Sequence, residues 1–223
     1  MYKAFGIVSS SGRNIYVDGM QDYRPIGAFS FLGRYRVIDF PISNMTNSNI
    51  ERIQVYINNK PRSVVEHLGT GRHYNINSKS GRLHILYSDF ANAEWSVYNN
   101  DLAAYEENME CIEAVKYPYV VIAPSYMIYT QNYDELLKTH IESGADITLL
   151  YHSVDNAKEY YLNCSTLNLN KQKGVLSLEP NHGNAKNRNI FMDTYVMRKD
   201  LFMELVKKGR KISSMFTLND IVN

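Results

Sequence analysis

Apolar runs alternate with helical periods along most of the chain. Near-continuous apolar runs occupy residues 4–9, 52–57, 119–123 and 147–151. A run that is apolar at consecutive positions is typical of a strand in a parallel sheet, because helices cover both faces of such a sheet. The pattern therefore predicts four buried strands, and the segments between them are candidates for covering helices.

Two of the intervening segments carry clear helical signals. In residues 101–116, apolar side chains recur at spacings of three and four: Leu102, Tyr105, Met109, Ile112 and Val115. Further on, Asn132 is followed three residues later by Glu135, which is typical of a helix start, and Gly144 is typical of a helix end.

This alternation predicts an α/β doubly wound domain with a largely parallel sheet. Its ligand crevice should lie beyond the carboxyl ends of the strands, near Ser9, Ala123 and the turn before Ile147. Shorter runs at 164–169, 175–179 and 190–197 predict an antiparallel extension. We expect one domain over 1–223, with a sheet core at about 1–160, an extension at about 161–197 and C-terminal helices at 198–223.

Charge and composition exclude several classes of partner. The net charge of +1 gives no strong field toward nucleic acid, and no apolar run approaches the ~20 residues that span a bilayer. The basic run at 207–211 is interpreted as a helix C-terminus with Gly209 as its cap. Cys111 and Cys164 lie far apart, so we expect no disulfide framework and a cytoplasmic location.

The crevice segments contain little catalytic chemistry. The loop SSSGRN (9–14) has one glycine, whereas a loop that cradles phosphate needs several for close backbone approach. The segment APSYMIY (123–129) has no carboxylate for a metal ion. Six histidines are scattered without ligand spacing. The residues alone therefore predict a crevice without a visible catalytic set.

The stretch GRYRVIDFPISN (33–44) has two readings. Arg34 and Arg36 can form a solvated edge before a short buried segment that ends at Pro41. Arginines grouped at the entrance to buried backbone can equally bind phosphate groups. The spacing leaves both readings open.

The extended stretch GRYRVIDFPISNMTNSNI (33–50) resembles a segment of the ADP-glucose pyrophosphorylase (glucose-1-phosphate adenylyltransferase) family, roughly G-K-Y-R-I-I-D-F-P-L-S-N-x-x-N-S-G-I. Weaker matches follow in the family's order at 119–140, 144–148, 192–197 and 220–222. The resemblance implies a Rossmann-like nucleotidyltransferase domain with a mostly parallel mixed sheet. In the family a left-handed β-helix domain follows, which we expect to be absent from this chain. Active members use Mg²⁺ to make ADP-glucose and pyrophosphate from ATP and glucose 1-phosphate.

Several positions depart from the family's motifs. They are Gly12, Tyr16, Ile26, Ser125, Tyr126, Glu179 and Phe216. The resemblance places the nucleotide loop over 10–17, where only Gly12 clearly remains and Tyr16 replaces an arginine. Ile26 stands where the family has a lysine.

The positions that serve metal and sugar phosphate in the family also differ. Tyr126, after Ser125, stands for one metal-binding aspartate, and Phe216 for the second, while Asp220 remains. Glu179 reverses the charge of a lysine that would meet phosphate. Each such group commonly contributes ~3 kcal/mol or more to catalysis. We therefore expect no catalytic residue, no metal and no cofactor in this domain.

The resemblance then implies a GlgD-type, regulatory subunit of glycogen biosynthesis. Its expected partner is a catalytic GlgC-type subunit, in a hetero-oligomer that also uses the β-helix domain. Two alternatives stay open: an active transferase that uses Asp89, Glu94 or Asp193, and a module that senses a nucleotide or sugar phosphate.

Two sets of residues have further candidate roles. Arg34, Arg36, Asp39 and Asn44 either retain ligand binding or build the fold, with Asp39 and Asn44 satisfying buried backbone groups. The stretches 87–100 and 115–121 supply large rings for an interface or for covering the sheet: Trp95, Tyr98, Tyr117 and Tyr119.

Overall fold

The computed structural model describes residues 3–10, 17–57, 60–69, 71–76, 82–87 and 100–223. The chain divides into two compact units. The first comprises Met1–Thr148 and Tyr195–Val222, and the second comprises Leu149–Thr194 with Asn223. The division of one domain into a core, an extension and C-terminal helices stays a prediction.

The first unit is built on parallel strands in the order β5-β4-β1-β6. Their bounds are β1 Ala4–Ser9, β4 Arg52–Ile57, β5 Arg82–Tyr87 and β6 Tyr119–Pro124. The last residues of β10 (Arg188–Arg198) run antiparallel to β6. This is the strand order of one half of a doubly wound fold, so the predicted α/β class with a mostly parallel mixed sheet is confirmed.

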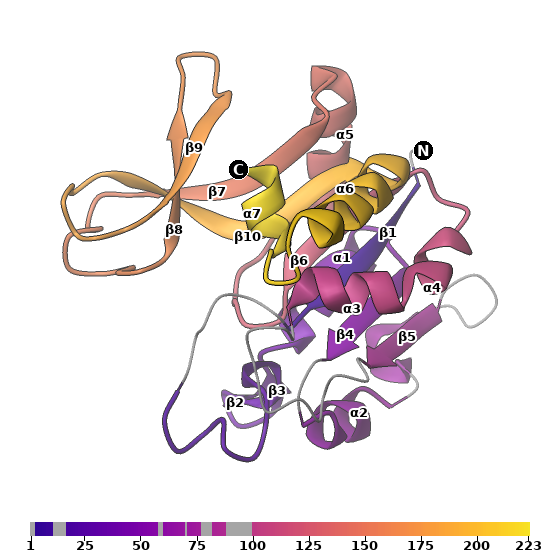
Figure 1. The fold of residues 1–223 in the computed structure, drawn as a ribbon. Helices are drawn as coiled ribbons and strands as arrows, with labels where there is room; N and C mark the ends of the chain where they lie inside the picture. Colours follow the sequence, from indigo (N-terminus) through magenta and orange to yellow (C-terminus); the bar gives the residue numbers. More distant parts are fainter. Residues whose placement is uncertain (1–2, 11–16, 58–59, 70, 77–81, 88–99) are drawn as a thin grey trace. The chain divides into compact units, whose positions relative to one another are not determined.

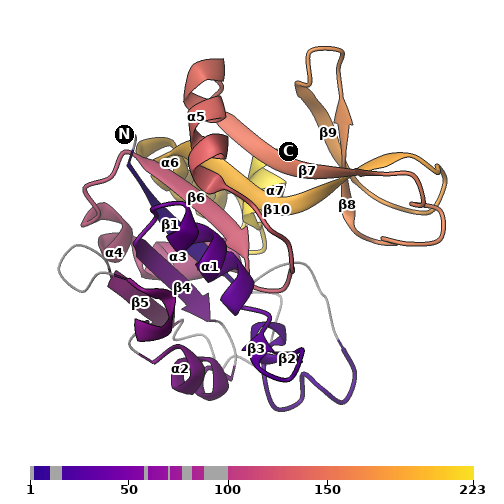
Figure 2. The same ribbon diagram turned by 180° about the vertical axis from the view of Figure 1, so that it is seen from behind.

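Helices cover both faces of this sheet. Those on one face are α1 (Asp39–Asn47), α2 (Arg62–Leu68) and α5 (Tyr133–Ser143), and they share a hydrophobic cluster with β1, β4 and β6. Those on the other are α3 (Asp101–Glu107), α4 (Met109–Glu113) and α6 (Lys199–Ile212). Figure 1 shows α3, α4 and α6 in front of the sheet, and Figure 2, from behind, shows α1 and α5.

Short elements complete the first unit. They are η1 (Ile26–Ala28), β2 (Ser30–Phe31), β3 (Tyr35–Arg36), η2 (Arg72–Tyr74) and α7 (Leu218–Val222). The stretch 33–44 therefore holds a hairpin strand and the start of α1. The sequence suggested that a buried segment ends at Pro41. In the structure, Pro41 instead lies in the first turn of α1. Proline is tolerated there because the N–H of the first turn has no intrahelical acceptor.

The signals for helix ends were partly correct. Asn132 caps α5, with its side chain accepting from the N–H groups of Asp134 and Glu135, and Gly144 follows with a φ of +66°. In contrast, the helix expected over 101–116 is broken at Asn108 into α3 and α4. The Asn108 amide donates to the Ala104 carbonyl at 3.0 Å, so this side chain competes with the helical backbone.

The prediction that Gly209 caps a helix is wrong. Gly209 is a buried residue within α6, which continues to Ile212 and is capped by Ser213. A Cβ atom at position 209 would lie 2.6 Å from Leu102 Cδ1. Glycine is therefore needed here because α6 approaches the buried Leu102 of α3 closely, and not because the chain turns.

The second unit is formed mainly by β-strands. Most of β7 (Ile147–Val154) and the first part of β10 belong to it, together with β8 (Ser165–Leu169) and β9 (Val175–Pro180). β8 pairs antiparallel with both β9 and β10, and an irregularity interrupts the β8–β9 register at Asn168 and Leu169. The predicted run of short antiparallel strands is therefore present. Among the described helices, none has the length and apolar character to cross a membrane.

Candidate functional site

The carboxyl ends of β1 and β6 meet at the point where the strand order reverses. The Ser125 N–H donates to the Ser9 carbonyl at 2.8 Å, and the two residues are only 3% and 6% exposed. Gly27 of η1 approaches closely, since a Cβ there would lie 3.3 Å from Ser125 Cβ. Ligands bind at this place in doubly wound folds, so this crevice is the candidate site.

The residues at the two metal positions do not fit a magnesium ion. Mg²⁺ takes hard oxygen ligands, usually carboxylates and water, but Tyr126 is a half-buried phenol and Phe216 offers no donor. Asp220 instead caps α7, where its carboxylate accepts from the Thr217 N–H at 2.9 Å and hydroxyl at 2.7 Å. In the part of the chain that the structure describes, no three His, Cys, Asp or Glu side chains gather as metal ligands.

The phosphate-binding positions are only partly described. Ile26 is half-buried at the start of η1, and its apolar side chain carries no charge for a phosphate group. Gly12, Tyr16, Asp89 and Glu94 lie outside the described residues.

Two residues singled out from the sequence lie in the second unit: Glu179, which stands where the family has a lysine, and Asp193, a candidate substitute acid. Glu179 is exposed on β9, where its carboxylate accepts from the Ser177 hydroxyl at 3.0 Å. Asp193 is half-buried in β10 and has a positive φ of 45°. The roles of both residues stay predictions.

A hydrogen-bonded cluster surrounds Asp39 at the start of α1. One carboxylate oxygen accepts from the Arg36 N–H at 2.8 Å, and the other contacts His67 Nε2 at 2.6 Å and accepts from the Tyr74 hydroxyl. Asp39 is 8% exposed. Burial, and then the hydrogen bond to Asp39, raise the pKa of Tyr74 well above its usual range, so this phenol stays protonated and donates.

The other residues of the stretch 33–44 have different surroundings. The Arg36 guanidinium donates to the Ser63 carbonyl, and the Asn44 amide donates to the Tyr129 carbonyl at 2.8 Å. Arg34 is exposed in the turn before β3. Asp39 and Asn44 thus satisfy backbone groups, which a structural role requires, while ligand binding by Arg34 and Arg36 stays a prediction.

Sequence reasoning missed His67 and Tyr74 as partners of Asp39. Each belongs to a different short helix, and no spacing in the sequence connects them to residue 39. The one available signal was an acidic residue within an apolar run, which implied a buried carboxylate in need of donors.

The chain is similar in sequence and fold to known proteins. Residues 23–210 match the family model described as nucleotidyl transferase. The chain belongs to the nucleotidyl transferase family. The matched residues include β4 and β6 of the first unit, and β6 ends at the crevice described above.

The curated relatives agree with the resemblance to ADP-glucose pyrophosphorylases of the GlgD type. The glycogen biosynthesis protein GlgD of Geobacillus stearothermophilus is 30% identical over 74% of this chain and 48% of its own length. The glucose-1-phosphate adenylyltransferase of Clostridioides difficile is 27% identical over 82% of this chain and 47% of its own length. The chain thus spans about half the length of these relatives.

A solved structure supports the fold. It is a putative glucose-1-phosphate thymidylyltransferase from Bacillus anthracis in complex with a sucrose, with a TM-score of 0.74. The alignment covers 98% of this chain and 81% of that one at 14% identity, which shows a shared fold and nothing finer.

Proposed function

We propose that this domain serves glycogen biosynthesis as a GlgD-like, non-catalytic partner of a catalytic glucose-1-phosphate adenylyltransferase. The observation that carries the proposal is the chemistry of the crevice. Ser9, Ser125 and Tyr126 end the two central strands with hydroxyl groups and no carboxylate. Phosphoryl transfer depends on positioned charges that stabilise the transferring phosphate, and neutral hydroxyls supply far less of this stabilisation.

The similarity to the glycogen biosynthesis protein GlgD of Geobacillus stearothermophilus supports the assignment to glycogen biosynthesis. In this proposal, the domain contributes surfaces through which related subunits assemble. A catalytic homologue in the same cell would then supply the chemistry, and a cytoplasmic location is part of this proposal.

The first test is an assay of the chain alone. With ATP, glucose 1-phosphate and Mg²⁺, we expect pyrophosphate release no faster than in a blank without protein. Turnover well above the blank that is lost on substitution of one acid, such as Asp193→Asn, would instead support an active transferase with substituted site residues.

A second candidate function is the sensing of a nucleotide or sugar phosphate. It is favoured by Arg34, which is exposed next to the hairpin strand that holds Arg36. Binding of glucose 1-phosphate or ATP, measured by calorimetry, would then weaken on Arg34→Gln. The matched control is Arg62→Gln, because Arg62 is exposed and pairs with Glu66 on α2.

A further inference from the structure

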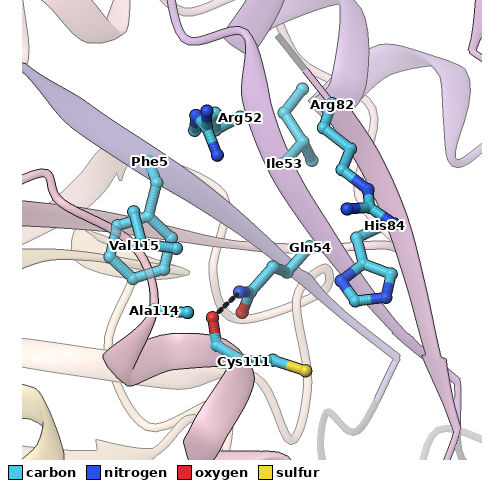
Figure 3. A pocket seen from close by; sticks show the side chains of 9 residues that line it. All are labelled: Phe5, Arg52, Ile53, Gln54, Arg82, His84, Cys111, Ala114 and Val115. Atoms are coloured by element: carbon cyan, nitrogen blue, oxygen red, sulfur yellow. Dashed lines mark hydrogen bonds between the residues drawn. The ribbon is translucent and has the colours of Figure 1, made fainter.

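A cavity lies at the amino ends of the parallel strands, at the end of the sheet opposite to the crevice. It has a volume of about 160 Å³ and is lined by the first residues of β4 and β5, by Phe5 of β1, and by residues of and after α4. Since β1, β4 and β5 are parallel, their amino ends lie together, away from the crevice at their carboxyl ends. Figure 3 shows Arg52 and Arg82 on neighbouring strands at this cavity.

Two exposed arginines line this cavity. Arg52 and Arg82 are paired in register on β4 and β5, and both line the cavity. Within the described ranges, no ion pair joins either one to an acid. Like charges directly opposite one another on neighbouring strands destabilise the folded protein by repulsion. An anion bound between the two arginines would reduce this repulsion.

An aromatic ring next to Arg52 brings a third cation to this end of the sheet. The ring of Tyr117 lies 5.8 Å from Arg52 Cζ and 5.8 Å from Lys3 Nζ, within the range of a cation–π contact. Lys3 therefore adds positive charge at the same end of the sheet, where the strands begin.

The inner part of the cavity is polar and fixed. The Gln54 amide donates to the Cys111 carbonyl at 2.8 Å, as Figure 3 shows, and its oxygen accepts from the Tyr56 hydroxyl at 3.0 Å. His84 is paired with Gln54 in register and also lines the cavity. Burial, and then the charge of Arg82, lower the pKa of His84, so the imidazole is neutral at pH 7.

We propose that this cavity binds a small phosphorylated anion, with Arg52 and Arg82 holding its phosphate group. A guanidinium presents parallel N–H donors that match two phosphate oxygens, and two such groups match a dianion. The apolar wall formed by Phe5 and Val115 suits a short carbon portion, and the volume limits the ligand to a few carbon atoms. The site is independent of the crevice and of the proposed partnership.

The test is calorimetric titration of the chain with inorganic phosphate at pH 7.5 and constant ionic strength. We expect saturable binding that weakens about ten-fold or more on Arg52→Gln and on Arg82→Gln, because each removes a charge-assisted pair. Arg62→Gln is the control, since it removes the same charge from an exposed residue outside the cavity. Arg82→Lys keeps the charge and should weaken binding less than Arg82→Gln.

Nuclear magnetic resonance of the His84 ring gives an independent readout. Bound phosphate should raise the pKa of His84, because it adds negative charge beside the imidazole, and Arg82→Gln should abolish this response. Absence of saturable binding at millimolar phosphate would overturn the proposal. Equal weakening of binding by Arg62→Gln would also overturn it, because the effect would then not come from this cavity. Binding of acetate as tight as that of phosphate would do so as well, because the site would then not be specific for a phosphate group.

Discussion

At the scale of single residues, Asp39 holds three separate segments of the first unit. Its carboxylate joins β3 to α2 and η2 through Arg36, His67 and Tyr74. Such a buried acceptor is costly to remove, because each donor then loses its partner in a place that water cannot fully reach.

Asp39→Ala should lower the free energy of unfolding by roughly 2–4 kcal/mol, because three donors are left unsatisfied. Urea unfolding followed by circular dichroism measures the change. Asp146→Ala is the control, since Asp146 is exposed and should change stability by about 0.5 kcal/mol or less. Equal effects of the two substitutions would show that the hydrogen bonds to Asp39 do not contribute to the free energy of unfolding.

Tyr126→Asp combined with Phe216→Asp should give at most feeble pyrophosphate release. Restoring two carboxylates leaves Ile26 in place of a lysine, and groups that act together in catalysis are not additive. The measurement is the same assay of pyrophosphate release with ATP, glucose 1-phosphate and Mg²⁺. Robust turnover by the double variant would show that the rest of the site is intact and that only the metal ligands had been lost.

Single residues were the least predictable part of the site from sequence. The sequence predicted that the carboxyl ends of β1 and β6 carry no charged residue at positions 9 and 125–126. This was possible because the end of a buried strand can be predicted from the end of its apolar run. The partners of Asp39 did not follow, since His67 and Tyr74 come close only after α1, α2 and η2 have packed.

At the scale of elements, the close contact between α3 and α6 depends on Gly209. Gly209→Val should lower the free energy of unfolding by about 1–3 kcal/mol, because its Cβ would displace the buried Leu102. Lys208→Val, on the exposed side of the same helix, is the matched control for the helix propensity of valine. Thermal or urea unfolding of both variants separates the two effects, and equal losses would rule out the packing explanation.

The docking of α7 depends on a buried carboxylate at the start of α3. Asp101 accepts from the N–H groups of Leu102 at 2.8 Å and Leu218 at 3.1 Å. Burial outweighs these bonds and, together with the charge of Asp220, raises the pKa of Asp101 to about 7.

The stability of the protein should therefore fall as the pH rises through this range. The folded state keeps a proton on Asp101 that the unfolded state, with a pKa near 3.8, has already lost. Between about pH 4 and pH 7 this group alone would remove up to about 1.4 kcal/mol of stability per pH unit, with no further change above pH 7.

Asp101→Asn tests this dependence. It keeps an oxygen acceptor for the N–H groups but cannot ionise, so the difference in unfolding free energy between the variant and the original chain should change between pH 5 and pH 8. Urea unfolding at the two pH values measures it. A difference that stays constant would show that Asp101 does not titrate in this range.

Elements were predicted well where a strong local pattern defined them. The four apolar runs became β1, β4, β6 and β7, and Asn132 and Gly144 bounded α5 as expected. The errors arose where tertiary contacts decided. Gly209 serves packing against Leu102, and the Asn108 side chain shares the Ala104 carbonyl with its own backbone N–H, so neither outcome was visible in the local sequence.

At the scale of the whole molecule, the proposed partnership predicts an effect on a catalytic homologue. The complete product of the gene that encodes this chain should co-purify with a glucose-1-phosphate adenylyltransferase from the same cell. Added in increasing amounts, it should raise the turnover of that enzyme or shift its response to effectors. No effect at saturating concentration would remove the regulatory proposal.

The order of the parallel strands also bears on how the protein is made. β1 is translated first, yet Ala4 pairs with Tyr119 of β6, and only β4 can join it earlier. At typical rates of synthesis, of about 5–20 residues per second, this apolar strand waits several seconds for its second neighbour. During that time the nascent chain presents an unpaired hydrophobic edge, so we expect its yield in the cell to depend on chaperones that bind near the ribosome.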